Sequence, residues 1–217
     1  MEARWYLVGV YQRKDRFYRQ ARSEGYRSRA AFKLIELDRR YHLFRRGDRV
    51  LDLGAWPGGW LQVAAQRVGE RGLVVAVDRT PIDSMAASVV CMTADVLAPS
   101  TLSEIRDRHG GNFDVILSDM APQLSGVRAT DEARAAELAE CALRVAHGLL
   151  RVGGCLIVKL FQSDAAMEFV KQLRPRFDSV KLTRPEATRS GSAELYAIAQ
   201  GLRSVRDSSE SDDRRNS

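Results

Sequence analysis

The stretch that decides the fold of this 217-residue chain reads LDLGAWPGGW, from Leu51 to Trp60. An apolar run over 49–53 enters a glycine-rich bend, and a pattern with helical spacing over 61–68 leaves it. A strand, a glycine loop and a helix in this order form the ligand-binding corner of doubly wound α/β sheets, where ligands sit at the carboxyl ends of strands. The stretch therefore predicts an α/β fold with a ligand site beside Gly54.

The spacing of the glycines indicates which ligand this corner takes. Gly54, Gly58 and Gly59 do not match G-x-G-x-x-G, the spacing that brings a dinucleotide pyrophosphate to a helix N-terminus. Asp52 lies just before the first of them. S-adenosylmethionine (AdoMet) has no phosphate and carries an ammonium, a sulfonium, a carboxylate and a ribose diol, so a carboxylate beside a glycine loop suits it better. We therefore expect AdoMet as the cofactor, and a nicotinamide-dependent dehydrogenase is disfavoured.

Strands and helices alternate along the rest of the chain. Continuous apolar runs predict further strands over 72–78, 89–92, 113–118, 155–161, 177–183 and 193–200. Helical spacing predicts helices over 28–41, 99–109, 131–150 and 163–174. We expect Ser28 to cap the first of these helices and Gly153-Gly154 to close the third. The alternation predicts a Rossmann-like α/β fold with a mostly parallel, seven-stranded sheet flanked by helices.

The chain divides into three parts by composition. Residues 1–26 form a basic arm, residues 27–202 form the α/β domain, and residues 203–217 form a polar tail without an apolar period. Such a tail cannot bury enough apolar surface to offset the entropy of ordering, so we expect it to be disordered.

The positive charge is concentrated at the N-terminal end. Residues 1–49 contain 14 Lys and Arg against 6 Asp and Glu, a net charge of +8, whereas the remainder has a net charge of −2. Seven aromatic residues are interleaved with the basic ones among the first 32. Basic side chains release counterions from phosphates and aromatic rings stack on bases, so this segment predicts contact with RNA. The alternative is a solvated basic surface that only aids solubility.

Other classes of partner are disfavoured by the composition. No run approaches the ~20 apolar residues of a membrane span, and the first residues lack a signal-peptide pattern. Cys91, Cys141 and Cys155 are widely spaced and form no C-x-x-C pair, which is typical of free thiols rather than of a disulfide frame or a zinc site. We expect a cytoplasmic monomer without a metal and without membrane contact.

Acidic residues follow three of the predicted strands. Asp78 ends the second strand, where a carboxylate accepts hydrogen bonds from a ribose diol. Asp95 follows the third strand, within reach of an adenine amino group, and Asp119 ends the fourth, beside the expected methyl donor. The stretch DMAP that begins at Asp119 lacks the aromatic residue typical of base N-methylating enzymes, and no cysteine has a neighbouring proline, so base methylation is disfavoured.

Three further charged residues stand in unusual places. Lys159 interrupts the buried strand over 155–161, and lysine is almost never buried without a partner or a task. Lys33 lies on an apolar helix, and Glu194 begins the last strand. An ammonium at position 159 would be drawn to Asp119, and a partly desolvated lysine near a second cation can serve as a general base. Each of these residues taken alone is also compatible with a solvated surface charge.

Five motifs together resemble the FtsJ/RrmJ family of AdoMet-dependent RNA 2′-O-ribose methyltransferases. They are SRAAFKL from Ser28, the glycine loop with Trp60, SDMAP from Ser118, VKLF from Val158 and ELY from Glu194. The resemblance covers about residues 15–200 in order. It implies that residues 27–202 are a methyltransferase domain.

The resemblance also implies roles for individual residues. It places the catalytic set on Lys33, Asp119, Lys159 and Glu194, in which Lys159 orients and deprotonates the 2′-hydroxyl and Asp119 positions Lys159. It places cofactor binding on a second set, whose members are Gly58, Trp60, Asp78, Asp95 and Asp119. No metal is implied.

The stretch GYRSR from Gly25 resembles prokaryotic members that methylate a uridine of large-subunit (23S) ribosomal RNA. The implied partner is ribosomal RNA within the large subunit or its precursor. The alternatives are a tRNA anticodon-loop 2′-O-methyltransferase of the same family and an RNA-binding ribosome assembly factor without catalysis. Two departures stand out: Trp56 replaces a small residue and would narrow the cofactor entrance, and Gly191-Ser192-Ala193 stands where an arginine or more charge is expected.

Overall fold

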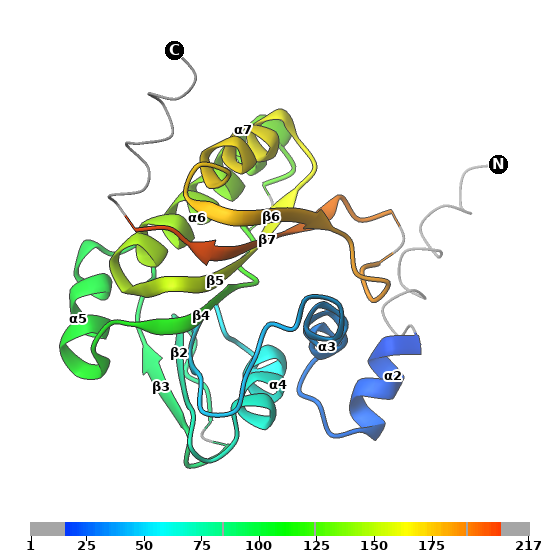
Figure 1. The fold of residues 1–217 in the computed structure, drawn as a ribbon. Coiled ribbons are helices and arrows are strands. Elements are labelled where there is room, and N and C mark those ends of the chain that lie inside the picture. Colours follow the sequence, from blue (N-terminus) through cyan, green and yellow to red (C-terminus); the bar gives the residue numbers. More distant parts are fainter. Residues whose placement is uncertain (1–15, 84, 124, 190, 205–217) are drawn as a thin grey trace.

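A computed structural model describes residues 16–204 except 84, 124 and 190. Residues 1–15 of the expected basic arm and the expected tail from residue 205 onward lie outside the described residues. Seven strands form one sheet in the order β3-β2-β1-β4-β5-β7-β6 (Figure 1). The strands are β1 (Arg49–Leu53), β2 (Leu73–Asp78), β3 (Val89–Thr93), β4 (Phe113–Ser118), β5 (Leu150–Phe161), β6 (Phe177–Thr183) and β7 (Glu194–Leu202).

Strand direction follows the prediction of a mostly parallel sheet. Strands β1 to β5 are parallel to one another, and β7 is antiparallel to both β5 and β6. Strand β1 lies between β2 and β4, so the chain leaves it toward one side of the sheet and later returns on the other. This is a topological switch point, where a crevice opens at the carboxyl ends of the strands.

Helices cover both faces of the sheet. They are α2 (Arg16–Ser23), α3 (Ala30–Tyr41), α4 (Gly59–Val68), α5 (Pro99–His109), α6 (Arg128–Leu149) and α7 (Asp164–Leu173). Helices α3 and α4 pack on one face, and α5, α6 and α7 pack on the other (Figure 1). No helix among the described residues is both long and apolar enough to cross a membrane.

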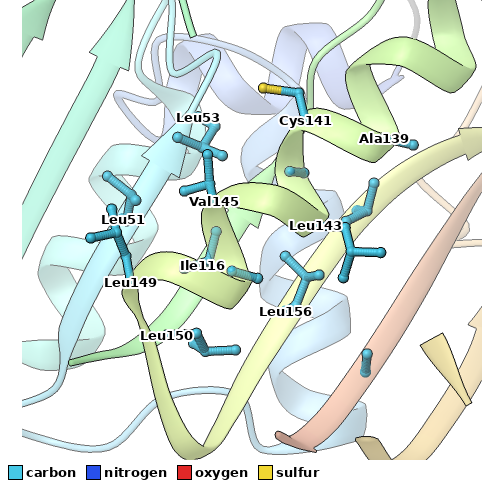
Figure 2. Close-up of a cluster of buried hydrophobic side chains, with 14 of the residues drawn as sticks. Leu51, Leu53, Ile116, Ala139, Cys141, Leu143, Val145, Leu149, Leu150 and Leu156 are labelled. Carbon is cyan, nitrogen blue, oxygen red and sulfur yellow. The ribbon is translucent and has the colours of Figure 1, made fainter. Parts of the chain in front are cut away.

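Two apolar cores lie between the sheet and these helices. Figure 2 shows the larger core, where Leu51 and Leu53 of β1 pack with Ile116 of β4 and with α6 side chains such as Val145. Side chains alternate between the faces of a strand, so Asp52 points to the opposite face, toward α3 and α4. Leucines hold β1 on one face, and Val50 packs on the face that carries Asp52.

Two local expectations differ from the structure. Ser28 does not cap α3, because the residue before the helix is Arg29 and no side chain caps it; the Ser28 hydroxyl packs against Gly59 instead. Helix α6 ends at Leu149 and passes directly into β5 at Leu150, so Gly153 and Gly154 lie within the strand rather than closing the helix. Pairing of Leu150 with β4 starts the strand before the glycines are reached.

Candidate active site

The predicted catalytic residues meet at the carboxyl edge of the sheet. Asp119 follows β4 directly, and Lys159 lies near the end of the neighbouring strand β5. Because β7 runs antiparallel to β5, its first residues return to this same edge: Lys159 pairs with Tyr196, and Phe161 pairs with Glu194. Sheet pairing therefore brings together residues that are far apart in the sequence.

A continuous chain of polar contacts joins these side chains. Lys159 Nζ lies 3.1 Å from Asp119 Oδ1 and also donates a hydrogen bond to the Asp119 backbone carbonyl. The Tyr196 hydroxyl donates to the same Asp119 Oδ1 at 2.7 Å. Lys33 Nζ donates to the Tyr196 hydroxyl oxygen at 3.2 Å and to Glu194 Oε2 at 2.7 Å. The four predicted residues thus form two ion pairs, and Tyr196 connects them.

Burial explains why the charges in this cluster must be paired. Lys33 and Lys159 are each only 8% exposed, and an unpaired ammonium at that depth would be very costly. Two lysines and two carboxylates balance, so the cluster carries no net charge. Burial, and then the neighbouring Asp119, raise the pKa of Tyr196 well above its ordinary value, so the phenol stays protonated and acts as a donor.

Tyr196 is a site residue that the sequence analysis did not single out for chemistry. A signal for it was present, because it lies two residues after Glu194 on a strand and therefore shares its face. Its ring also lies 5.7 Å from the ring of Trp60, centroid to centroid.

A cavity of about 490 Å³ lies beside Asp119 at the switch point. Its walls come from the ends of four parallel strands, with Gly54 after β1, Asp78 at the end of β2, Asp95 after β3 and Asp119 after β4. The volume is in the range of small-molecule and cofactor sites. The wall holds three carboxylates against one arginine, Arg79, and this excess of negative charge favours a cationic ligand over a phosphate.

The carboxylates of the cavity wall are held by backbone amides. Asp78 accepts hydrogen bonds from the amide of Trp56 at 3.0 Å and from that of Thr80 at 2.8 Å. Asp95 accepts one from the amide of Leu97 at 2.9 Å. Asp78 therefore ties the glycine loop to the end of β2, and both carboxylates keep acceptor capacity for a ligand.

The glycine loop reaches the cavity through its first glycine. Gly54 has a φ of +72°, and a Cβ atom there would lie 2.5 Å from Met120 Cγ. Trp56, the residue noted for its size, lines the cavity and is 57% exposed. Narrowing of the cofactor entrance by Trp56 stays a prediction.

Two of the predicted cofactor residues are placed differently. The Trp60 side chain is buried, and its indole N–H donates to the backbone carbonyl of Ala30 at 2.8 Å. Neither Gly58 nor Trp60 lines the cavity. They stand at the start of α4, where first-turn amides have no partner within the helix, so any contact with a ligand would use their backbone groups.

Asp52 is a further acidic residue near the site. It is 1% exposed, and neither carboxyl oxygen has a hydrogen-bond partner among the described residues. Burial, followed by the charges of Asp119 and Asp78, raises the pKa of Asp52 to about 8.

Among the described residues no cluster of His, Cys, Asp and Glu has the arrangement of a metal site.

The model of the FtsJ-like methyltransferase family matches residues 26–202. The chain belongs to this family. It is 46% identical over 198 residues to the ribosomal RNA large subunit methyltransferase E of an Anaeromyxobacter species, covering 91% of this chain and 72% of that protein. It is also 46% identical to the protein of the same name from Acidithiobacillus ferrooxidans, covering 88% of this chain and 87% of the relative.

Solved structures of other proteins share the fold. A protein from Plasmodium falciparum described as a ribosomal RNA methyltransferase is 25% identical, with a TM-score of 0.71 over 82% of this chain and 98% of its own. The fibrillarin pre-rRNA processing protein of Methanococcus jannaschii is 15% identical, with a TM-score of 0.54 over 74% of this chain and 69% of its own. The second likeness concerns the fold alone.

Proposed function

We propose that this FtsJ-like methyltransferase transfers a methyl group from AdoMet to a ribose 2′-hydroxyl of large-subunit ribosomal RNA, at a uridine of the 23S RNA. The observation that carries the proposal is the chain of contacts from Glu194 through Lys33, Tyr196 and Asp119 to Lys159, which ends beside an acidic cavity. A positioned lysine next to a cofactor-sized cavity suits methyl transfer to a hydroxyl.

The cavity fits AdoMet in size and in charge. The cofactor supplies an electrophilic methyl group on a sulfonium, and it carries one net positive charge. Asp78, Asp95 and Asp119 in the wall offset that charge, and we expect the first two to accept hydrogen bonds from the ribose diol and the adenine amino group. Gly54 leaves room for Met120 in the cavity wall, since a Cβ atom at position 54 would collide with its side chain.

Lys159 is the group that handles the proton of the acceptor hydroxyl. Two of its interactions go to Asp119, one to the carboxylate and one to the backbone carbonyl, so the direction of the amine is fixed. Once the ammonium has lost one proton to solvent, the remaining position on Nζ carries a lone pair, which would orient the 2′-hydroxyl and accept its proton when AdoMet supplies the methyl group. Holding both reactants in line accounts for most of the acceleration in such a displacement.

A second groove, of about 470 Å³, offers a surface for the RNA backbone. It is lined by Arg16 and Phe17 of α2, by Arg29 before α3, and by Arg184 and Arg189 of the β6–β7 connection. Burial and the nearby Arg189 lower the pKa of the Arg29 guanidinium, which reflects a cluster of like charges. Such a cluster is stabilised when phosphates lie against it.

The names of the relatives favour ribosomal RNA over tRNA, since both proteins quoted above are ribosomal RNA large subunit methyltransferases. The complete catalytic cluster argues against an assembly factor without catalysis, because two buried lysines with matched carboxylates serve no RNA-binding purpose. We place the basic arm at 1–26, the methyltransferase domain at 27–202 and the polar tail at 203–217, in a cytoplasmic monomer.

Lys159→Ala provides the direct test of the proposed chemistry. The variant should lose about 10²–10⁴-fold in single-turnover rate on large-subunit RNA with labelled AdoMet, the usual contribution of a positioned acid or base. AdoMet affinity should survive, because Lys159 does not line the cavity. The control is Lys171→Ala on α7, which removes an exposed lysine. A near wild-type rate for Lys159→Ala, or labelling of tRNA in preference to ribosomal RNA, would contradict the proposal.

A further inference from the structure

Asp52 is a carboxyl group whose surroundings give it nothing to bind. It lies in the middle of β1, 1% exposed, and both of its oxygens lack hydrogen-bond partners among the described residues. An ionised carboxylate without hydrogen bonds is too costly in the interior of a protein, and such a group takes up a proton instead. The surroundings of Asp52 therefore favour the neutral carboxylic acid over the carboxylate.

The charged groups nearest to Asp52 also favour its protonated form. Asp78 at the end of β2 and Asp119 after β4 flank it, and both are acidic. Helix α4, which packs on this face of β1, contributes apolar side chains to the core there. Lys159 and Lys33 are already engaged with Asp119, Glu194 and the Tyr196 hydroxyl. Within the described chain, no cation is thus committed to Asp52.

We propose that Asp52 is protonated in the cofactor-free protein and releases its proton to solvent when AdoMet binds. This inference rests on the proposed cofactor. A cation in the cavity bordered by Asp78 and Asp119 offsets the two charges that oppose ionisation of Asp52, and adds an attraction of its own. The step is an acid dissociation: the O–H bond breaks, its electron pair stays on the carboxylate, and the proton passes to the buffer.

The protonation state of Asp52 should also differ between the complex with the methyl donor, AdoMet, and the complex with its product, S-adenosylhomocysteine. S-adenosylhomocysteine lacks the sulfonium charge and is neutral overall, so Asp52 remains protonated when it is bound. The donor therefore selects the ionised form of the site, and the product selects the neutral form. Linkage then requires AdoMet affinity to rise with pH, by up to about tenfold per pH unit below the titration of Asp52, while product affinity changes little.

Calorimetry measures the released proton directly. AdoMet and S-adenosylhomocysteine are titrated into the full chain near neutral pH, in phosphate and in Tris, whose ionisation enthalpies differ widely. The difference in observed enthalpy should correspond to about one proton released per AdoMet and to far less for S-adenosylhomocysteine. Equal release for the two ligands, or no release with AdoMet, would overturn the proposal.

Asp52→Asn keeps the shape of the side chain and removes its titration. It should release no proton, bind AdoMet more weakly than the wild type and bind S-adenosylhomocysteine equally well. Asp107→Asn, at an exposed position of α5, should behave as the wild type. Proton release that persists in Asp52→Asn would overturn the assignment to this residue.

Infrared difference spectroscopy on the wild type covers the case in which Asp52→Asn fails to fold. The carbonyl band of a buried carboxylic acid should be present in the cofactor-free protein and disappear when AdoMet is added. A spectrum without that loss would overturn the proposal. Binding of AdoMet without proton release contradicts the role of Asp52 alone, whereas no binding of AdoMet contradicts the proposed function as well.

Discussion

Tyr196 converts two separate ion pairs into one connected unit. Each lysine could satisfy its own carboxylate in several orientations, because an ammonium is a point charge with freely rotating donors. The Tyr196 hydroxyl accepts from Lys33 and donates to Asp119, so the two pairs are linked through a single rigid side chain. We infer that this link keeps Asp119, and through it Lys159, in one orientation.

Tyr196→Phe should therefore slow the reaction while the fold is retained. Asp119 loses one donor, which costs about 1–3 kcal/mol when the group is left unpaired, and Lys33 loses one acceptor. The rate at saturating AdoMet should fall, whereas AdoMet affinity should hold. Urea unfolding and single-turnover assays measure the two effects. Tyr41→Phe, on α3, serves as the control, and an equal loss in both variants would exclude a special role for Tyr196.

Asp52 predicts how stability changes with pH. Its pKa is about 8 in the folded protein against 3.8 for an ordinary aspartate, so between these values the folded state holds one proton more than the unfolded state. The free energy of unfolding contributed by Asp52 is therefore full below the lower value and is lost as pH rises through the higher one. The melting temperature of the cofactor-free protein should fall across this range more steeply than that of Asp52→Asn. Parallel curves for the two proteins would contradict the shift.

The connections between strands and helices create the cavity, and Gly54 is the position where this can be tested. Its positive φ favours glycine, and a Cβ would meet Met120 Cγ at 2.5 Å. Gly54→Ala should lose about 1–3 kcal/mol of stability from overpacking and should weaken AdoMet binding, because Met120 is displaced. Gly110→Ala has a similar φ of +71° with open space around it, so it carries the strain without the collision. Equal AdoMet affinity in both variants would show that the loop does not contact the cofactor.

The assignment of helices and strands decides which site residues could be predicted from the sequence. Carboxyl ends of parallel strands meet at one edge, so Asp78, Asp95, Asp119 and Lys159 could be grouped from strand assignments alone. The role of Tyr196 was not predicted, since it depends on the antiparallel register of β7 against β5.

The direction of individual side chains, and the exact ends of helices, were harder to predict from the sequence than the strands and helices themselves. Trp60 follows the glycine loop in sequence, yet its ring packs inward because Ala30 accepts its indole N–H. Ser28 looked like a helix cap, but its hydroxyl lies against Gly59, a contact between distant segments. Gly153 and Gly154 looked like a helix end, yet sheet pairing of Leu150 takes precedence. In each case a tertiary contact outweighs the local preference.

The positive charge of the groove proposed for RNA does not come from the N-terminal segment alone. The sequence places the positive excess before residue 50, but the groove proposed for RNA combines that segment with the β6–β7 connection. In Figure 1 this connection reaches from the sheet toward α3 and α2. Arg184 and Arg189 therefore supply charge at an edge where Gly191-Ser192-Ala193 supplies none.

Replacing Arg16, Arg184 and Arg189 by glutamine should weaken RNA binding and flatten its dependence on salt. Each phosphate that the protein no longer neutralises should reduce the slope of log affinity against log salt by ~0.7–0.9. KM for RNA should rise while AdoMet affinity stays the same, because these arginines line a different cavity. The matched control replaces three exposed arginines elsewhere, Arg71, Arg108 and Arg174. Equal slopes for the two triple variants would mean that only net charge matters.

Transfer of a methyl group to a ribose of large-subunit RNA is tested most directly by a map of ribose methylation across total cellular RNA. The map compares cells that carry the protein, cells that lack it and cells complemented with Lys159→Ala. We predict one 2′-O-methyluridine in the large-subunit RNA that is present only with the wild-type protein, and unchanged tRNA. A methyl group on a base, a site in tRNA, or full methylation with Lys159→Ala would contradict the proposed function.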